Sequence, residues 1–431
     1  MSVLEHVFSK IGLEFDEEIG TYAHVKTKIP LTVYYDDEKE ELVLLDQTKL
    51  PFEVTVWKTR DWSEAGNPGI KGMIVRGSQA IGCAAGYAML LAANSFKSFG
   101  RKEFMEKLGE AASFLRATRP TASPLKWAVD LCERAARNAL RDKGVNEAVD
   151  AVKETADYIL ASDLIMNWYL RQEGKPFIKD GDVIMTHCNG GSLSSTFGGH
   201  ALGIIEEAYA EGREIMVVAK ETRPRSQGYK LTTWELNRAG VPVVIITDNM
   251  ISSAIERFGV TKVLLGVDRV ARDGSVANKI GSADIARVVA LYENIEFYYA
   301  TSYSTIDLET LEGKNIPIEE RSIDEVTYPY ELEAKDKKEK GILSSKSLDR
   351  WPPRELLVQG KPGRGQIAIY NPAFDVTPPK LIDLIITDIG VFAPQQIRTL
   401  TEEKITLMVK ERLEKQGISM PKYIAATRNE T

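Results

Sequence analysis

Cys188 and Asp268 are the residues of this 431-residue chain best suited to chemistry, and each follows an apolar run that predicts a buried strand. Cys188 precedes a Gly-Gly loop and then a predicted helix. A helix N-terminus lowers the pKa of a thiol, so Cys188 is a candidate for a reactive thiolate. If both side chains face one ligand, the thiol could act as general base and the carboxyl group of Asp268 as general acid.

Both residues also have an ordinary structural interpretation. Most free cysteines are small buried side chains, and Cys188 would then fill space at a crossover of the chain. Asp268 would cap a helix or form an ion pair with Arg269 or Arg272. The residue types and their positions leave these alternatives open.

A glycine-rich run over residues 69–82 offers a site for an anion. It leads into a predicted helix, whose first backbone N–H groups suit a phosphate, and Arg76 would add charge-assisted hydrogen bonds. The run lacks the Gly-Lys-Ser/Thr ending of a P-loop, so it does not imply ATP binding. Arg116, Arg119 and Thr121 form a second polar group before a helix. Isolated arginines are usually surface ion pairs, but together with glycine loops they indicate a phosphorylated ligand.

The remaining two cysteines and two of the histidines have the sequence context of structural residues. Cys83 and Cys132 lie on apolar faces of predicted helices, and the odd number of cysteines fits a reducing compartment. His187 follows an apolar strand, and His200 begins a predicted helix. The sequence contains no H-x-x-x-H or H-E-x-x-H, so we expect no transition-metal site.

The elements that must position these residues fall into two parts of the chain with different sequence patterns. The first part, residues 1–174, predicts a small N-terminal β plus helical domain. Its predicted strands are 30–35, 41–45 and 54–58, and its predicted helices are 79–97, 102–116, 123–140 and 143–172.

The second part, residues 175–431, alternates short apolar runs with helical stretches, which predicts a Rossmann-like parallel sheet covered on both faces. The fold class is therefore α/β. The predicted strands are 182–186, 215–219, 241–247, 262–267 and 295–300, and the predicted helices are 197–211, 230–239, 250–258 and 281–292.

Polar, glycine-containing loops follow four successive strands of this sheet. Ligands of open parallel sheets bind outside the carboxyl ends of the strands, so these loops predict a small-molecule pocket with hydrogen-bonding and cationic walls. The loops comprise residues 187–192, 220–228 and 248–249, and then 268–274 and 278–281, which both follow the fourth of these strands.

A polar stretch at about 331–366 interrupts the alternation and predicts a surface insertion. It is either a solvated loop or a lid or partner contact anchored by Trp351. The whole chain has 55 Lys+Arg against 62 Asp+Glu, a net charge of −7 that argues against nucleic acid as a partner. No apolar run reaches the roughly 18 residues of a membrane span, and the first residues lack the layout of a secretory signal. We expect a cytoplasmic protein without a membrane partner.

Eight short motifs occur in a fixed order, and together they resemble the 5-methylthioribose-1-phosphate isomerase family of methionine salvage, a pathway of amino-acid biosynthesis. The same superfamily includes archaeal ribose-1,5-bisphosphate isomerases and regulatory subunits of the eukaryotic translation-initiation guanine-nucleotide exchange factor. One departure is Gln79, which stands where the family usually has proline. The motifs are residues 75–82, 119–122, 186–189, 221–228, 247–250, 268–270, 277–281 and 371–379.

The resemblance implies roles for individual residues. The family's cysteine and acid match Cys188 and Asp268, and a homodimer formed through the Rossmann-like domain is implied. The expected contacts to the phosphate and sugar are Arg76, Gly77, Ser78, Arg119, Gln227, Asn278 and Lys279.

The implied substrate is a phosphorylated pentose whose anomeric oxygen carries the phosphate, so its ring cannot open spontaneously to an aldehyde. The enzyme must protonate the ring oxygen, break the C1–O bond and move hydrogen from C2 to C1. Asp268 would be the acid, kept protonated by desolvation. Cys188 would take the C2 proton or assist a hydride shift, and no metal or redox cofactor is required.

Three alternatives stay open at this point. Two are sister isomerases that act on 5-deoxyribose 1-phosphate or on ribose 1,5-bisphosphate. The third is a non-catalytic regulatory subunit that resembles the translation-factor subunits, and the presence of both Cys188 and Asp268 argues against it.

Overall fold

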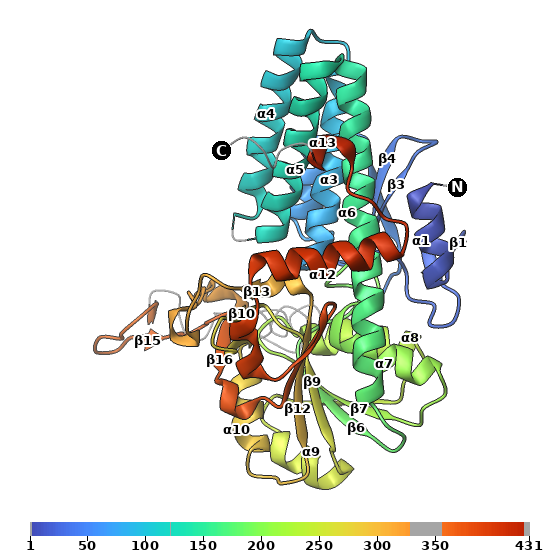
Figure 1. Ribbon diagram of the computed structural model, residues 1–431. Coiled ribbons are helices and arrows are strands. Elements are labelled where there is room, and N and C mark those ends of the chain that lie inside the picture. Colours follow the sequence, from blue (N-terminus) through green and yellow to red (C-terminus); the bar gives the residue numbers. More distant parts are fainter. Residues whose placement is uncertain (1, 121, 328–355, 426–431) are drawn as a thin grey trace.

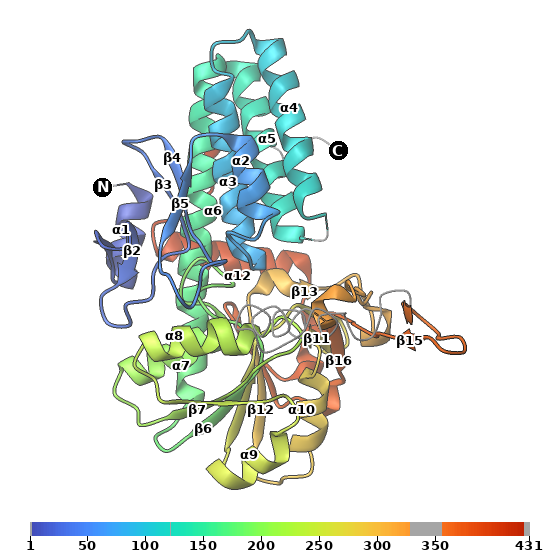
Figure 2. The same cartoon turned by 180° about the vertical axis from the view of Figure 1, so that it is seen from behind.

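A computed structural model describes residues 2–120, 122–327 and 356–425. A bundle of long helices stands on a layer built around a parallel sheet, and one helix, α6 (Val145–Gly174), runs through both parts (Figure 1). Figure 2 shows the opposite side, where a small antiparallel sheet lies against the bundle. The mixed α/β class predicted from the sequence is confirmed.

The bundle forms because its helices carry apolar residues at helical spacing. In α5, Leu125, Ala128, Val129, Cys132 and Ala136 are all buried. Helix α3 is buried around most of its circumference and packs against the other three. The bundle consists of α3 (Ser78–Ser95), α4 (Arg101–Thr118), α5 (Ser123–Asp142) and α6, each within two residues of its predicted ends.

The first part of the chain forms two small antiparallel sheets. The three predicted strands are present as β3–β4–β5, and this sheet packs on α3. Helix α1 and the β1–β2 hairpin were not predicted, because the helix has only nine residues and each strand only four, and such short elements carry little periodic signal. The elements are α1 (Val3–Ile11), β1 (Leu13–Asp16), β2 (Thr21–His24), β3 (Val33–Asp36), β4 (Glu41–Leu45), β5 (Val56–Thr59) and α2 (Trp62–Glu64).

The large sheet has seven strands in the order β18-β17-β12-β9-β6-β7-β8, all parallel except the edge strand β18. Its first five strands in chain order are the five predicted ones. The strands are β6 (Val183–Thr186), β7 (Met216–Lys220), β8 (Val243–Ile246), β9 (Lys262–Leu265), β12 (Glu296–Thr301), β17 (Leu384–Thr387) and β18 (Gly390–Phe392).

Alternate residues of these strands enter two different apolar cores. Ile184 and Val217 pack with α6 and α7, whereas Met185 and Val218 belong to the core that includes α9 and α10. Both faces of the sheet are therefore covered, which explains why its strands are almost continuously apolar. The connecting helices are α7 (His200–Ala210), α8 (Thr233–Arg238), α9 (Ile251–Phe258) and α10 (Ser282–Val289).

A second sheet of four short strands lies beyond the carboxyl end of β9 and was not predicted. Its order is β13-β10-β11-β16. Residues 268–281, interpreted above as loops, form its central hairpin, and Asp268 directly precedes the first strand. The strands are β10 (Arg269–Ala271), β11 (Val276–Lys279), β13 (Ile306–Asp307) and β16 (Phe374–Thr377).

The C-terminal helices return to the bundle: α12 (Glu402–Lys415) contacts α6, and α13 (Lys422–Ala425) contacts α5 (Figure 1). Most of the predicted insertion at 331–366, including Trp351, lies outside the described residues. In the remainder, β14 (Leu357–Val358) pairs with β15 (Ile367–Ala368). Across the described ranges, no helix is long and apolar enough to cross a membrane.

Candidate functional site

A cavity of about 1350 Å³ lies where the carboxyl ends of the parallel strands face the bundle. The bundle contributes the start of α3, and the sheet contributes the loops after β6, β7 and β9. The structure brings to this one cavity all nine residues that the resemblance assigned to the site. They are Arg76, Gly77, Ser78, Arg119, Cys188, Gln227, Asp268, Asn278 and Lys279.

Cys188 directly follows β6 and lies half-buried in the cavity wall. Its φ of 64° places it in the left-handed region, which costs a residue with a β-carbon about 1–3 kcal/mol. The predicted activation by a helix N-terminus is wrong, because the next helix, α7, begins only at His200. Burial raises the pKa of the Cys188 thiol, and the positive charges of Lys279 and Arg76 partly oppose this rise. Those two cations, rather than a helix, are what can stabilise a thiolate here.

Asp268 directly precedes β10 and exposes its carboxyl group to the cavity. The alternative in which it pairs with Arg269 is wrong, because Arg269 Nη1 forms an ion pair with Asp307 Oδ2 at 2.9 Å. Desolvation by the surrounding protein raises the pKa of Asp268, and Lys279 is the strongest opposing charge. The predicted direction is confirmed: the cavity favours the protonated acid.

Three predicted cations, Arg76, Arg119 and Lys279, line the same cavity as the thiol and the acid. Arg76 Nη2 donates to Asn189 Oδ1 at 2.6 Å, and Lys279 Nζ donates to the Ala373 carbonyl oxygen at 3.1 Å. Within the described part of the chain, Arg76 Nε and Arg119 Nη1 are buried without a hydrogen-bond partner. An unpaired buried donor costs about 1–3 kcal/mol, so an anionic ligand that accepted these hydrogen bonds would be favoured.

Gly77 brings the start of α3 against the loop that follows Cys188. Its φ is +93°, and a β-carbon there would lie 2.2 Å from the Ser194 carbonyl oxygen, so only glycine fits. Ser78 begins α3 at the cavity, with the positive end of the helix dipole directed toward it. Gln79, expected to replace the family's usual proline, is buried, and its Nε2 donates to Ser304 Oγ at 3.4 Å.

The other two predicted contacts differ in their surroundings. Gln227 precedes the turn that leads into α8, and its Oε1 is buried with no hydrogen-bond partner among the described residues. Asn278 lies on β11, and its Nδ2 donates to Ser282 Oγ at 2.9 Å. Gln227 thus keeps an unused acceptor for a ligand hydroxyl, whereas the Asn278 amide is partly engaged.

Arg321 and Glu319 also line the cavity and were not singled out from the sequence. Their charges act on the Asp268 carboxyl group, and Arg321 also acts on Arg119. Their segment is fixed by backbone pairing, with Arg321 N–H donating to the Asn371 carbonyl oxygen at 2.8 Å. The stretch follows neither a predicted strand nor a glycine loop, so strand-end reasoning could not find it.

Two residues grouped with Arg119 in the sequence do not join the site. Arg116 forms ion pairs with Asp130 and Glu133, both at 2.6 Å, and Thr121 lies outside the described residues. Cys83 is buried in the bundle, and burial raises the pKa of its thiol, as expected of an inert cysteine.

His187 and His200 line the cavity but are neutral, because burial lowers their pKa to about 3 and about 4. His187 Nε2 lies 2.8 Å from the Ile280 carbonyl oxygen, which supports the structural role predicted for it. In the described ranges, no group of three or more His, Cys, Asp or Glu side chains could hold a metal ion.

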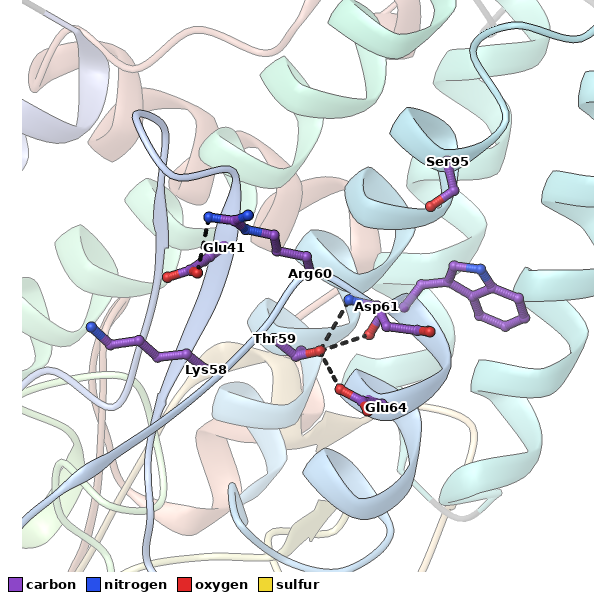
Figure 3. A pocket seen from close by; sticks show the side chains of 8 residues that line it. Glu41, Lys58, Thr59, Arg60, Asp61, Glu64 and Ser95 are labelled. Atoms are coloured by element: carbon purple, nitrogen blue, oxygen red, sulfur yellow. Dashed lines mark hydrogen bonds and ion pairs between the residues drawn. The ribbon is translucent and has the colours of Figure 1, made fainter.

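A second, shallower cavity of about 570 Å³ lies beside β5 and α2 (Figure 3). Its polar groups are bonded to one another: Thr59 Oγ1 donates to Glu64 Oε2 at 2.7 Å, and Arg60 pairs with Glu41 at 3.2 Å. Such mutual pairing leaves little for a ligand to bind, so the large cavity is the candidate site.

A model of the initiation factor 2 subunit family matches residues 74–394, which include the predicted site residues. The chain belongs to this family. Curated relatives named methylthioribose-1-phosphate isomerase come from several bacteria. The relative from Petrotoga mobilis is 38% identical over 82% of this chain and 93% of its own length. The relative from Nostoc sp. is 38% identical over 84% of this chain and 96% of its own length.

Solved structures of the family carry two kinds of name. The 5-methylthioribose 1-phosphate isomerase from Pyrococcus horikoshii is 31% identical, with a TM-score of 0.72 over 90% of this chain and 96% of that one. The translation initiation factor eIF-2B, subunit delta, from A. fulgidus is 34% identical, with a TM-score of 0.71 over 88% of this chain and 99% of that one. The overall fold therefore does not separate an isomerase from a translation factor, and the site must decide.

Proposed function

We propose that this protein is an aldose–ketose isomerase that converts 5-methylthioribose 1-phosphate into 5-methylthioribulose 1-phosphate. The observation that carries the proposal is that Cys188 and Asp268 line one cavity together with Arg76, Arg119 and Lys279. A thiol, an acid and unpaired cationic donors are what an isomerisation of a phosphorylated sugar needs. The relatives named methylthioribose-1-phosphate isomerase support the same substrate.

Asp268 has the properties required for the first step. The phosphate on O1 prevents spontaneous ring opening, so an acid must protonate the ring oxygen while the C1–O ring bond breaks. The raised pKa of Asp268 favours the protonated form of its carboxyl group, and the cavity exposes that group to a ligand. Binding of the sugar displaces water from the cavity and would favour the protonated form further.

Two routes then move hydrogen from C2 to C1. In one, the Cys188 thiolate takes the C2 proton to give an enol phosphate and returns it to C1. In the other, the C2 hydrogen moves to C1 as a hydride. In both routes the Asp268 carboxylate recovers a proton from the C2 hydroxyl group as the carbonyl forms. The acid is thus regenerated and no external oxidant or reductant is consumed.

The cations hold the phosphate and oppose its elimination from C1. Arg76 and Lys279 lie close enough to the Cys188 thiol to lower its pKa, so they serve both the phosphate and the thiolate. Arg119, at the C-terminal end of α4, lines the same cavity from the helical bundle. A phosphate in this cavity would satisfy the buried donors of Arg76 and Arg119.

Proton NMR of the protein with 5-methylthioribose 1-phosphate tests the function. Formation of the ketose supports the proposal, and its absence with folded protein contradicts it and favours a regulatory subunit. The same reaction in D₂O separates the routes, because the enol route can place deuterium at C1 and the hydride route cannot.

Parallel assays with 5-deoxyribose 1-phosphate and ribose 1,5-bisphosphate test the sister activities. The apolar side chains of Met73, Ile81 and Phe374 in the cavity wall favour a methylthio group at C5. Preferred turnover of the bisphosphate would contradict this substrate assignment while leaving the isomerase chemistry intact.

We also propose that the protein is a homodimer formed through its Rossmann-like domain, with a domain boundary near residue 174. Helix α6 runs through both parts and ends at Gly174, and the first strand of the parallel sheet, β6, begins at Val183, which supports a boundary in the chain at this point. Edge strand β8 of the Rossmann-like domain supports the dimer contact, because Ile245 and nearby Met250 are exposed apolar side chains. Light scattering during gel filtration of the wild type and an I245D variant tests the dimer. A monomeric wild type would contradict it.

A further inference from the structure

Two buried threonines hold the main-chain groups of Cys188 from both ends. The Cys188 N–H donates to Thr222 Oγ1 at 2.8 Å, and Thr232 Oγ1 donates to the Cys188 carbonyl oxygen at 2.5 Å. Both threonines are 0% exposed. We propose that Thr222 and Thr232 are positioning residues that fix the thiol at its reacting position, an inference that rests on the proposed isomerase function.

The backbone of Cys188 needs such a constraint. Its φ of 64° is unfavourable for a residue with a β-carbon, by about 1–3 kcal/mol. A hydrogen bond within a protein contributes about 0.5–1.5 kcal/mol, so the two threonine hydrogen bonds together are comparable with that strain. Loss of either one would leave the strained peptide free to relax, and the thiol would move with it.

The Thr222 hydroxyl group is oriented so that its oxygen can accept. Its hydrogen has two acceptors, His187 Nδ1 and the Lys220 carbonyl oxygen, both at 3.2 Å. His187 is neutral, and its Nε2 lies 2.8 Å from the Ile280 carbonyl oxygen, so its proton belongs on Nε2 and Nδ1 is an acceptor. With either acceptor, an oxygen lone pair of Thr222 remains for the Cys188 N–H.

Asp248 fixes the main chain of Thr222 itself. The Thr222 N–H donates to Asp248 Oδ1 at 3.0 Å, and the Arg223 N–H donates to Asp248 Oδ2 at 2.7 Å. Thr222 follows β7 and Asp248 follows β8. The thiol is therefore positioned by the carboxyl ends of three neighbouring strands, since Cys188 itself follows β6.

Thr232 connects the thiol to the phosphate side of the cavity. Asn189 Nδ2 donates to Thr232 Oγ1 at 3.3 Å and to Glu235 Oε1 at 2.6 Å. Asn189 Oδ1 accepts from Arg76 Nη2 at 2.6 Å. The same network that holds Cys188 thus also orients Arg76, so it sets the separation between the thiol and the phosphate-binding guanidinium group.

Substitutions that differ only in the hydroxyl group test the proposal. Valine keeps the shape of threonine without the hydroxyl group, and serine keeps the hydroxyl group without the methyl group. The variants are T222V, T222S, T232V and T232S, with T155V as the control. Thr155 is equally buried, and its Oγ1 donates to the Ala151 carbonyl oxygen at 2.7 Å, within the bundle helix α6.

Two readouts are measured on folded protein, verified by circular dichroism and thermal unfolding. The first is kcat and KM for 5-methylthioribose 1-phosphate. The second is the rate of alkylation of Cys188 by iodoacetamide across a pH series, quantified on the modified peptide by mass spectrometry. The second readout does not depend on turnover.

We expect T222V and T232V to lower kcat by about 10²-fold with KM changed less than about threefold, because a displaced reacting group costs about this much. Their alkylation midpoint should move to lower pH, because burial is the main cause of the raised pKa of Cys188 and release of the thiol reduces that burial. T222S and T232S should restore both values, and T155V should leave both unchanged.

Failure of this inference and failure of the proposed function give different results. A wild type that does not convert the sugar contradicts the function, and the alkylation series then tests the threonines alone. Folded T222V and T232V with wild-type kcat and alkylation profiles overturn the positioning role. Serine variants as impaired as the valine variants also overturn it, because the hydroxyl groups would then not be responsible.

Discussion

Replacement of Asp268 by asparagine removes the proposed acid while keeping the size of its side chain. The Asp268 side chain is exposed to the cavity, and its neighbour Arg269 pairs with Asp307 instead. We therefore expect the stability of D268N to lie within about 0.5 kcal/mol of the wild type, as for an ordinary surface substitution. Any loss of turnover then reports on chemistry and not on folding.

The expected loss follows from the role of a general acid. Such a group contributes about 10²–10⁴-fold to a rate, and each factor of ten corresponds to about 1.36 kcal/mol, so the barrier rises by about 2.7–5.4 kcal/mol. Arg76, Arg119 and Lys279 are unchanged in the variant, so KM should change only a few-fold. Proton NMR of ketose formation at saturating substrate measures kcat over this range.

D268N should also change the titration of Cys188. The charge of Asp268 raises the pKa of the Cys188 thiol, so its removal lowers that pKa and moves the alkylation midpoint to lower pH. D273N is the matched control, because Asp273 caps the same hairpin at Ser275 N–H (2.9 Å) and does not line the cavity. Wild-type turnover in D268N, or an unchanged thiol titration, would refute the convergence of the acid and the thiol on one ligand.

Three further predictions concern single substitutions. C188S should lower kcat by at least about 10²-fold with KM nearly unchanged; wild-type turnover would exclude Cys188 from the reaction. R119A should weaken binding by about 2 kcal/mol, measured as a raised KM, whereas R116A should leave KM unchanged because Arg116 pairs with Asp130 and Glu133. The wild type should lose about 2 kcal/mol more stability than H200Q between pH 7 and pH 5, because the His200 imidazole is protonated below about 6.5 when unfolded but only below about 4 when folded. Urea unfolding at the two pH values measures this difference, and equal losses would contradict it.

The parallel sheet could be predicted because burial on both faces leaves a direct record in the sequence. Residues 183–186 and 262–265 are apolar at nearly every position, since alternate residues enter two different cores. The position of Cys188 at a strand end followed from the same pattern. The pattern could not predict the electrostatic environment of the Cys188 thiol. The loop from 190 to 199 separates the thiol from the N-terminus of α7, so the helix does not act on it.

The hairpin that carries Asp268, Asn278 and Lys279 could not be predicted in the same way. Strands β10 and β11 are three and four residues long, too short for a periodic signal. Their partners β13 and β16 begin at Ile306 and Phe374, so the pairing that stabilises them is non-local. Arg321 could not be predicted for a related reason: its backbone pairing with Asn371, which brings it to the cavity, is also non-local.

The loop after β6 links catalysis to the contact between the bundle and the sheet. It carries Cys188, and a few residues later its Ser194 backbone packs against Gly77 at the start of α3. Gln79 adds a second link by donating to Ser304, a residue that follows β12. Proline, which has no side-chain donor, could not form this link. Since the thiol lies on the sheet side and Arg76 on the bundle side, a substitution that shifts this contact must change the distance between thiol and phosphate. Such a substitution should therefore change kcat and KM together, whereas loss of a single phosphate contact changes mainly KM.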